Sequence, residues 1–462
     1  MDQTTFATLN LQQDLLENLV SLGYVSMTPV QAQCLPAVLE GRDVIGQAKT
    51  GSGKTVAFGL GVLERLDVRR FNVQALVLCP TRELADQVAK ELRRLARAIP
   101  NVKILTLCGG MPLGPQIGSL EHGAHVVVGT PGRLEEHIRK GTLVLEELQV
   151  LVLDEADRML EMGFQPAVDA IVAATPNERQ TLLFSATYPS GIEQIAQRVM
   201  RSPLRIVVEG LHDSQTIQSV FYKVGASEAA RIEAVCLLLH KFNAGSTLVF
   251  ANTRESCQLI ADELNRYGFC ARALHGDLDQ RARDETLVLF ANRSLSVLVA
   301  TDVAARGLDI DALDCVINFH LARDPEVHVH RIGRTGRAGE RGMALSLYSD
   351  KERHKVERLE AALGQAIEAK NLPSTEQLDK VAPLPPMVTL QIDGGKKQKV
   401  RPGDIVGALT GEGGITADQI GKIAVFDFCA YVAVDRQVKA IALEKLGKGK
   451  LKGRSFRVRW IR

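Results

Sequence analysis

The sequence lacks several features that would mark a secreted, membrane-spanning or zinc-binding protein. Its eight cysteines are scattered over 462 residues without a Cys-x-x-Cys pair, which argues against both a zinc site and a disulfide framework. No apolar run approaches the roughly 20 residues that span a bilayer, and the N-terminal segment has neither the basic nor the apolar region of a signal peptide. These absences predict a cytosolic protein, in which Cys79, Cys108 and Cys315 are buried thiols. The length of the chain predicts roughly three domains.

The net charge of +2 for the whole chain hides an uneven distribution. Residues 387–462 carry 15 Lys or Arg against 7 Asp or Glu, a net charge of +8, whereas the preceding residues carry 41 against 47, a net charge of −6. A compact basic segment on a mildly acidic body is typical of a domain that binds a polyanion. A solubilising tail is the alternative, but the alternation of apolar and polar residues predicts that this segment folds.

Residues 48–55, Ala-Lys-Thr-Gly-Ser-Gly-Lys-Thr, have the composition of a phosphate-binding loop. They lie between a short predicted strand at 43–46 and a helical pattern, as such loops do. Glycines let the backbone N–H groups turn towards the phosphates, Lys54 can reach the β and γ phosphates, and Thr55 can hold Mg²⁺. An ordinary glycine-rich turn is the alternative, since Ala48 replaces the first glycine of the strict pattern. The predicted nucleotide-binding residues of this loop are Thr50, Gly51, Ser52, Gly53, Lys54 and Thr55.

Residues 154–157, Asp-Glu-Ala-Asp, follow the apolar run 150–153, which predicts a buried parallel strand. Asp154, at the carboxyl end of this strand, can hold the same Mg²⁺ through its water ligands. Glu155 can orient and deprotonate an attacking water. An isolated Asp-Glu pair is usually a solvated surface, but together with the phosphate loop it predicts a nucleoside triphosphatase.

Predicted strands alternate with helical patterns through the first two thirds of the chain, which is the signature of parallel α/β sheets. A polar stretch at 209–219 separates two such blocks, and a proline-rich stretch at 371–386 is predicted to be a semi-rigid spacer. The second block has no phosphate loop, but its Arg334 and Arg337 suit a γ-phosphate held by the first block, so that ATP would close a cleft between them. A solvated basic loop is the alternative. Strands are predicted at 73–79, 102–108, 126–128, 148–153, 181–184, 246–250, 271–274, 296–300, 315–319 and 343–348.

Motif by motif, residues 1 to about 365 resemble the DEAD-box RNA helicases. Residues 154–157 spell the motif that names the family, and Thr28-Pro29-Val30-Gln31 matches its adenine-reading segment. The resemblance implies that Gln31 reads the edge of adenine, that Phe6 stacks on the base and that Asp309 touches the ribose. It also implies that the two arginines of the second block are arginine fingers.

The same resemblance implies RNA-backbone contacts from both blocks. Threonine hydroxyls, unobstructed glycine N–H groups and the planar fork of arginine all suit phosphate oxygens, and such contacts position a strand without reading its sequence. Ser185-Ala186-Thr187 matches the segment that couples hydrolysis to strand separation. The residues with implied RNA contacts are Thr81, Arg82, Gly110, Thr130, Arg133, Gln280, Arg283 and Thr301.

The basic segment has a βαββαβ pattern, which is the order of an RNA-recognition fold. Its predicted strands lie at 387–392, 423–426, 431–434 and 455–461, and its predicted helices at 401–409 and 437–446. The aromatic residues with which such sheets stack bases are largely missing, because the third strand offers only Tyr431. We therefore expect RNA contacts from basic loops on two sides of the fold, namely Lys396, Lys397, Lys399 and Arg401 on one and Lys448, Lys450, Lys452 and Arg454 on the other. The segment also resembles the RNA-binding domain of one bacterial branch of the family, which implies a hairpin of large-subunit ribosomal RNA as ligand and ribosome assembly as the process.

The sequence thus predicts an α/β protein with two tandem RecA-like parallel-sheet domains and a small C-terminal α+β RNA-recognition-like domain. The predicted function is that of an RNA-dependent ATPase and helicase that uses ATP and Mg²⁺ and binds RNA and pre-ribosomal particles but no membrane. The sequence does not give the oligomeric state, and we favour a monomer. An ATP-gated RNA clamp or remodeller with little unwinding, and a non-enzymatic scaffold, are the alternatives. The predicted domains and linkers are 1–208, 209–218 (linker), 219–365, 366–386 (linker) and 387–462.

Overall fold

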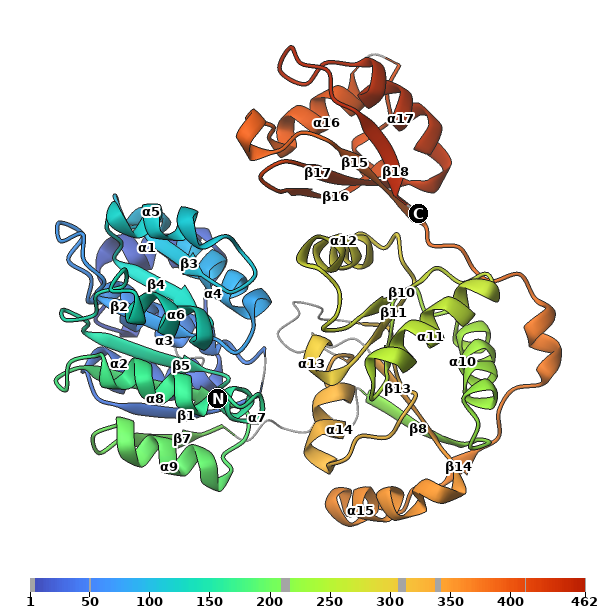
Figure 1. Ribbon diagram of the computed structural model, residues 1–462, viewed down its shortest axis with the longest axis horizontal. Helices are drawn as coiled ribbons and strands as arrows, with labels where there is room; N and C mark the ends of the chain where they lie inside the picture. Colours follow the sequence, from blue (N-terminus) through green and yellow to red (C-terminus); the bar gives the residue numbers. More distant parts are fainter. Residues whose placement is uncertain are drawn as a thin grey trace. The chain divides into compact units, whose positions relative to one another are not determined.

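The computed structural model describes residues 5–49, 51–208, 217–305, 313–336, 342–411 and 413–461 (Figure 1). These residues form two compact units, of which the first contains one parallel sheet and the second contains another together with a C-terminal antiparallel sheet. The predicted fold class is confirmed. We use the names domain 1 for residues 5–208, domain 2 for 217–382 and C-terminal module for 387–461. None of the described helices is long and apolar enough to cross a membrane.

In the described part of domain 1, seven parallel strands lie in the order β3-β4-β2-β5-β6-β1-β7. Val77 and Val152 belong to an apolar cluster on one face of the sheet, and Leu76 and Leu151 to a cluster on the other. Because both faces are buried, these strands are continuous apolar runs. The strands are β1 (Val44–Gln47), β2 (Ala75–Leu78), β3 (Ile104–Leu107), β4 (Val126–Gly129), β5 (Val150–Asp154), β6 (Gln180–Ser185) and β7 (Leu204–Val207). The helices are α1 (Gln13–Ser21), α2 (Pro29–Leu39), α3 (Lys54–Glu64), α4 (Arg82–Leu95), α5 (Leu113–Glu121), α6 (Pro131–Arg139), α7 (Ala156–Glu161), α8 (Gln165–Ala173) and α9 (Ser190–Val199).

Domain 2 repeats this architecture. Its described strands lie in the order β10-β11-β9-β12-β13-β8-β14, so that numbering the strands from the start of each domain gives the same order in both. By this correspondence β8 matches β1, β9 matches β2 and β12 matches β5. The strands are β8 (Ile217–Lys223), β9 (Thr247–Phe250), β10 (Ala271–Leu274), β11 (Val297–Ala300), β12 (Cys315–Asn318), β13 (Gly342–Tyr348) and β14 (Ala369–Lys370). The helices are α10 (Glu228–Phe242), α11 (Arg254–Arg266), α12 (Gln280–Ala291), α13 (Asp302–Ala305), α14 (Pro325–Ile332) and α15 (Arg353–Leu363).

Three strands were not predicted from the sequence. Strands β7 and β14 lie at the edges of their sheets and keep exposed residues, so neither forms an apolar run. Strand β8 begins at Ile217, inside the predicted polar break, because its exposed Gln218 and Ser219 resemble a loop. The residues 209–216 of that break lie outside the described ones.

The predicted proline-rich spacer is largely part of domain 2. Before it, β14 pairs with β8; within it, Leu372 and Leu378 pack against the apolar core of domain 2, and Ala382 is buried in that core. The prediction of a spacer over 371–386 is therefore wrong up to residue 382. Proline content predicts an extended backbone, but it does not predict whether the few apolar residues between the prolines pack against a neighbouring domain.

The C-terminal module has the predicted βαββαβ order. In its described residues, the antiparallel strands lie in the order β16-β17-β15-β18. Val388, Leu390 and Ile392 alternate along β15 and belong to the apolar core shared with the two helices. The elements are β15 (Met387–Ile392), α16 (Pro402–Thr410), β16 (Ile420–Val425), β17 (Ala430–Asp435), α17 (Lys439–Lys448) and β18 (Val458–Ile461).

All eight cysteines lie among the described residues and are free. Cys79, Cys108 and Cys315 are buried, as predicted. Burial raises the pKa of Cys108 and of Cys315 to about 12, so both are neutral thiols at physiological pH.

Candidate active site and RNA interface

The phosphate loop joins the carboxyl end of β1 to the start of α3. Gly51 and Gly53 have φ angles of 81° and 92°, which side chains rarely adopt. A Cβ atom on Gly53 would lie 2.4 Å from Nε2 of Gln31, so only glycine fits there. The side chain of Lys54 is buried, and its Nζ donates a hydrogen bond to the carbonyl of Ala48 (2.6 Å). This hydrogen bond joins the end of the phosphate loop at Lys54 to its start at Ala48.

The adenine-reading segment is hydrogen-bonded to this loop. Oγ1 of Thr28 donates to the carbonyl of Ser52 (2.7 Å), and Nε2 of Gln31 donates to the carbonyl of Gly53 (3.1 Å). Oε1 of Gln31 accepts from the N–H of Thr28 (2.8 Å). Phe6 exposes only 3% of its surface and packs edge-on against Tyr24. The structure therefore brings Gln31 to the loop, whereas the ring of Phe6 lies in the core.

The acidic motif stands at the carboxyl end of β5. Asp154 is buried, and burial raises its pKa to about 7, against the charge of Lys54, which lowers it. Glu155 has φ 50° and ψ 50°, a left-handed conformation that is costly for a residue other than glycine. Its Oε2 lies 3.3 Å from Nη1 of Arg158, and both side chains are buried, but neither atom has a hydrogen-bond partner among the described residues. The carboxylate of Glu155 thus keeps an acceptor that a water could use.

The last residue of the acidic motif contacts the predicted coupling segment. Oδ2 of Asp157 accepts hydrogen bonds from the N–H and from Oγ1 of Thr187, both at 2.9 Å. Oγ of Ser185 accepts from the N–H of Asp157 (3.3 Å). Burial acts to raise the pKa of Asp157, but the hydrogen bonds from Thr187 and the charges of Lys54 and Arg158 together outweigh it, and the pKa lies below its usual value. A movement of Asp157 would therefore shift Thr187, in the segment that follows β6.

The residues around β5 fit a nucleotide-bound Mg²⁺ better than a metal held by protein alone. Among the described residues, no group of three or more His, Cys, Asp or Glu could hold a metal ion. Mg²⁺ is usually held by one or two protein ligands, with water and substrate phosphates completing its shell. Asp154 supplies a buried carboxylate, and a dication beside it would stabilise the ionised form that burial disfavours. Thr55 follows the anchored lysine as the second predicted ligand.

The predicted RNA contacts of domain 1 gather at the loop 109–111 that follows β3. A Cβ atom on Gly110 would lie 2.0 Å from the guanidinium of Arg82, so the two residues touch. Oγ1 of Thr130 accepts a hydrogen bond from the first N–H of the loop (3.4 Å), and Nη1 of Arg133 donates to its last carbonyl (2.9 Å). These residues come from the carboxyl ends of β2, β3 and β4, which meet at one edge of a parallel sheet.

Two predicted RNA contacts of domain 2 also lie together. Nη2 of Arg283 donates to the carbonyl of Ala304 (3.1 Å), whose own N–H donates to Oγ1 of Thr301 (3.3 Å). Arg334, which follows α14, is 5% exposed. Thr50, Asp309 and Arg337 lie outside the described residues.

Sequence reasoning missed a second copy of one motif. Thr81-Arg82-Glu83 follows β2, and Thr253-Arg254-Glu255 follows β9, its counterpart in domain 2. Oγ1 of Thr81 caps α4 by accepting from Leu84 (3.3 Å), and Oγ1 of Thr253 caps α11 by accepting from Ser256 (3.1 Å). The identical tripeptides at matching strand ends were the signal that would have found Thr253 and Arg254.

Arg331 was also not assigned a role from the sequence. It is 2% exposed, and its Nε and Nη2 hold the two carboxylate oxygens of Asp302 at 2.6 and 2.7 Å. Nη1 donates to Oδ1 of Asn318 (3.1 Å) and to the carbonyl of His320 (2.7 Å). Arg331 therefore links α14 to α13 and to the end of β12. Because its partner Asp302 directly follows Thr301, Arg331 helps to fix the position of Thr301.

The two basic segments of the C-terminal module meet at the first turn of α16. Oδ2 of Asp404 accepts a hydrogen bond from the N–H of Arg401 (2.8 Å) and lies 3.5 Å from Nζ of Lys452. The segments 396–401 and 448–454 therefore meet at this point, whereas we had expected them on two sides of the fold. Their separation in the sequence gave no sign of this contact. Tyr431, in contrast, is 2% exposed and offers no platform for a base.

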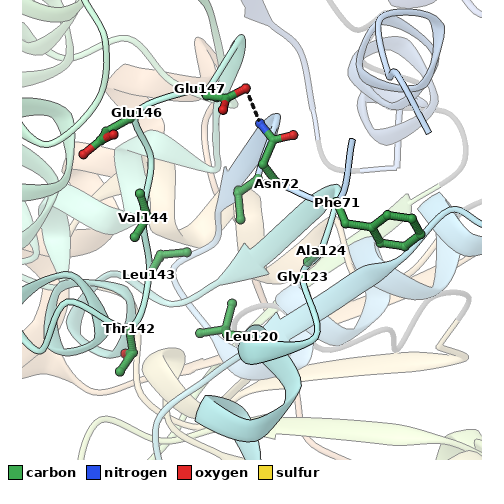
Figure 2. Close-up of a pocket in the computed structure, with 11 residues that line it drawn as sticks. Phe71, Asn72, Leu120, Gly123, Ala124, Thr142, Leu143, Val144, Glu146 and Glu147 are labelled. Atoms are coloured by element: carbon green, nitrogen blue, oxygen red, sulfur yellow. Dashed lines mark hydrogen bonds between the residues drawn. The ribbon is translucent and has the colours of Figure 1, made fainter. Parts of the chain in front are cut away.

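A cavity of about 250 Å³ lies at the opposite edge of the sheet of domain 1 (Figure 2). It is lined by residues that precede β2, β4 and β5, among them Phe71, Leu120 and Leu143, and at its rim Asn72 donates to Glu147 (3.0 Å). Because these are the amino ends of the strands, the cavity takes no part in the site formed at their carboxyl ends.

A phosphate loop on β1, a buried Asp-Glu pair on β5 and a second sheet of the same order define a nucleoside triphosphate-dependent helicase. The chain belongs to the DEAD/DEAH box helicases: the model of that family matches residues 28–195, and the helicase conserved C-terminal domain matches 230–339. Within the family it is a DbpA-like RNA helicase, since the DbpA RNA binding domain matches residues 389–460. It is therefore an RNA-dependent ATPase.

Known relatives agree with this assignment, one of them over nearly the whole chain. The ATP-dependent RNA helicase DbpA of Escherichia coli is 53% identical over 460 residues, which cover 99% of this chain and 100% of the relative. The helicase CshA of Geobacillus kaustophilus is 42% identical over 81% of this chain and 80% of its own. Among solved structures, S. cerevisiae Dbp5 bound to RNA and ADP BeF3 is similar with a TM-score of 0.73 and 29% identity, over 82% of this chain and 98% of that one.

Proposed function

We propose that this helicase remodels a hairpin-containing segment of large-subunit ribosomal RNA during ribosome assembly in the cytoplasm. Residues 387–462 are the targeting domain in this proposal. The observation that carries it is that the carboxylate of Asp404 accepts a hydrogen bond from the backbone N–H of Arg401 and lies 3.5 Å from Nζ of Lys452, so that the two basic segments meet there. The match of this module to the DbpA RNA binding domain supports the same ligand class.

The residues of domain 1 would perform the hydrolysis. On binding ATP, the ammonium group of Lys54 would exchange its hydrogen bond to the carbonyl of Ala48 for contacts with phosphate oxygens. Thr55 and Asp154 would hold Mg²⁺, which supplies charge neutralisation of the phosphates when bound. Glu155 accepts the proton of the attacking water. Gln31 reads adenine, with Phe6 stacking on the base once its ring leaves the core.

Domain 2 would complete the reaction with groups that domain 1 lacks. Arg334 and Arg337 stabilise the charge that develops on the γ-phosphate, and Asp309 binds the ribose. The RNA backbone is held by Arg82, Gly110 and Thr130 in domain 1 and by residues of domain 2. The domain 2 set comprises Arg283 and Thr301, with Thr253 and Arg254 added on the internal repeat.

The test compares ATP hydrolysis and duplex unwinding for fragments of large-subunit ribosomal RNA with and without single hairpins. The variant Lys397→Glu with Lys450→Glu changes one residue in each basic segment, and Lys370→Glu with Lys422→Glu changes the same charge elsewhere. We expect one hairpin to stimulate the wild type best. We expect the first variant to need about tenfold or more RNA for half-maximal stimulation and to lose about two units of its salt slope. The control should behave as the wild type.

Two results would contradict parts of the proposal. Equal stimulation by all fragments would exclude targeting to one hairpin. Stimulated ATP hydrolysis without strand displacement would favour the alternative function, an ATP-gated RNA clamp or ribonucleoprotein remodeller.

A further inference from the structure

The loop 109–111, where the proposed RNA contacts of domain 1 gather, begins with a peptide group that is held at both ends. Nε2 of Gln116 donates a hydrogen bond to the carbonyl of Cys108 (3.0 Å). Oγ1 of Thr130 accepts one from the N–H of Gly109 (3.4 Å). Because this carbonyl and this N–H belong to one planar peptide unit, the two bonds together fix its orientation. They therefore set the direction in which the loop leaves β3.

Gln116 is an uncommon kind of residue for a helix to bury. Of the nine residues of α5, all of which the structure describes, only Gln116 is buried. The buried positions of a surface helix are usually apolar, and glutamine is mostly exposed in folded proteins. Here both ends of the amide have partners, since its Oε1 lies 3.1 Å from Nε2 of His137 while its nitrogen faces Cys108. A buried amide with both ends hydrogen-bonded is held in one orientation.

The ring of His137 has one proton arrangement that satisfies this contact. His137 lies on α6 and is completely buried. Burial lowers the pKa of His137, and the charges of Arg133 and Lys140 act in the same direction, so the ring is neutral at physiological pH. Oε1 of Gln116 can only accept a hydrogen bond, so the single proton of the neutral ring is on Nε2.

Thr142 stabilises this tautomer from the other side of the ring. With the proton on Nε2, Nδ1 of His137 is an acceptor, and the hydroxyl of Thr142 donates to it (2.8 Å). Thr142 also lines the cavity at the amino ends of the strands (Figure 2). Thr142, His137 and Gln116, which we call the His137 network, thus connect that edge of the sheet to the opposite edge, where the loop 109–111 begins.

We propose that the His137 network positions the loop 109–111 for RNA. The hydroxyl of Thr142 keeps the proton of the ring on Nε2, and His137 then holds the amide of Gln116 with its nitrogen towards the loop. The other tautomer would place a bare ring nitrogen against the amide oxygen. If the amide turned to relieve this, its oxygen would face the carbonyl of Cys108. His137 is a positioning residue, because it acts on RNA only through Gln116. The RNA step rests on the proposed function, whereas the hydrogen bonds do not.

The hydrogen bonds are tested by ¹⁵N NMR of the full-length protein with labelled histidine rings. The signals of His137 are those that disappear in His137→Gln. At neutral pH we expect the shifts of a neutral ring with its proton on Nε2. Thr142→Val, which keeps the shape but removes the hydroxyl, should give a mixture of both tautomers, and Thr142→Ser should give the wild-type pattern. A proton on Nδ1 in the wild type, or identical signals in the wild type and Thr142→Val, would overturn the proposal.

The positioning role is tested with His137→Leu, which leaves the acceptor of Gln116 buried and unpaired. His137→Gln is the matched variant, because its amide nitrogen can take the place of Nε2. We expect His137→Leu to raise the RNA concentration for half-maximal ATPase activity by about fivefold to tenfold, with kcat and KM for ATP within about twofold. His137→Gln should return the RNA requirement to within about twofold of the wild type. Urea denaturation shows whether each variant is folded.

Thr142→Val gives the same comparison if His137→Leu does not fold, and it should raise the RNA requirement by about threefold. Gln116→Leu shows whether His137 acts through the amide. The double variant of His137→Leu and Gln116→Leu should need no more RNA than Gln116→Leu alone. Effects that add in the double variant, or an unchanged RNA requirement in the folded His137→Leu or Thr142→Val, would refute the positioning role.

Arg82→Ala separates this inference from the proposed function, because the guanidinium of Arg82 touches Gly110 in the same loop. If Arg82→Ala raises the RNA requirement while the folded variants of His137 and Thr142 do not, the loop holds RNA but the His137 network does not position it. If none of these variants raises the RNA requirement, the loop does not hold RNA, and that part of the proposed function is wrong as well.

Discussion

The two parallel sheets share one strand order, yet among the described residues only domain 1 carries the phosphate loop and the Asp-Glu pair that we propose for ATP hydrolysis. In the strand registers, Leu153 of β5 pairs with the last residue of β2, and Asn318 of β12 pairs with the last residue of β9. Phe319 and His320 therefore stand where domain 1 has its Asp-Glu pair. Phe319 is buried, and burial with the charge of Arg231 lowers the pKa of His320 to about 4. Domain 2 thus offers neither a carboxylate for a metal ion nor a charged base at this place.

The repeat is kept at the proposed RNA contacts. Both domains have a Thr-Arg-Glu sequence after the second strand, with the threonine capping the following helix and the arginine beside a glycine, at Gly110 in domain 1 and Gly276 in domain 2. A sheet of this order can hold a phosphate backbone from either domain, because the contacts come from helix starts and glycine turns that the fold itself provides. Catalysis needs additional residues on β1 and β5, and these are not shared.

The largest effect is expected from Glu155→Gln, because an amide cannot take the proton of the attacking water. We expect ATP hydrolysis to fall by about 10³- to 10⁴-fold, with ATP binding retained, measured by single-turnover hydrolysis and equilibrium titration. The matched change in domain 2 is His320→Gln, which should alter turnover by less than about threefold. Near wild-type turnover in Glu155→Gln would show that the base is another residue.

Arg334→Ala should lower turnover by about 10³-fold, on the scale of other arginine fingers. ATP binding should be unchanged, because the phosphate loop and Gln31 lie in domain 1. Steady-state kinetics with RNA in excess give the comparison. If kcat survives and only the RNA concentration for half-maximal activity increases, Arg334 contacts RNA and does not stabilise the charge that develops on the γ-phosphate.

Arg82→Ala and Arg254→Ala test the repeated RNA contact directly. Each removes one phosphate partner, so each should raise the RNA concentration for half-maximal ATPase activity by about tenfold and reduce the salt slope by about one unit. The two effects should be similar, and kcat should remain within about twofold. An effect of Arg82→Ala alone would mean that the repeat in domain 2 is structural.

The smallest effect concerns stability without nucleotide. The folded-state pKa of Asp154, about 7, is raised above its usual value of 3.8, so its ionisation costs stability as the pH rises through this window. Asp154→Asn removes the cost, and we expect the variant to gain stability over the wild type between about pH 4 and 7, with a constant difference above pH 7 of at most about 4 kcal/mol. Urea denaturation at several pH values measures it. A difference independent of pH would show that the carboxyl group is solvated.

The nucleotide site could be predicted from the sequence because its residues are consecutive. Residues 48–55 and 154–157 each follow a strand, and a strand end fixes where the next side chains point. The sequence could not predict contacts between distant segments, such as Asp404 between Arg401 and Lys452, because nothing in composition encodes which loops meet. For the same reason, the sequence could not predict that Thr389 and Gln391 on β15 of the module are buried. A polar residue on a sheet face indicates water or a polar partner, and only the fold distinguishes between them.

The residues between Leu372 and Ala382 also decide how the C-terminal module can be transplanted. Strand β14 completes the second sheet, and the apolar residues behind it fill the core of domain 2. A chimeric helicase joined after Gly364 would therefore receive a foreign edge strand and an incomplete core, and its failure would reveal nothing about RNA targeting. Joined at Pro386, the same chimera would keep its domain 2 intact but would need a recipient helix that matches α12, because Asn292, directly after α12, donates a hydrogen bond to Thr389 of the module (3.0 Å). The portable unit for redirecting another helicase is therefore the module together with the helix on which it rests.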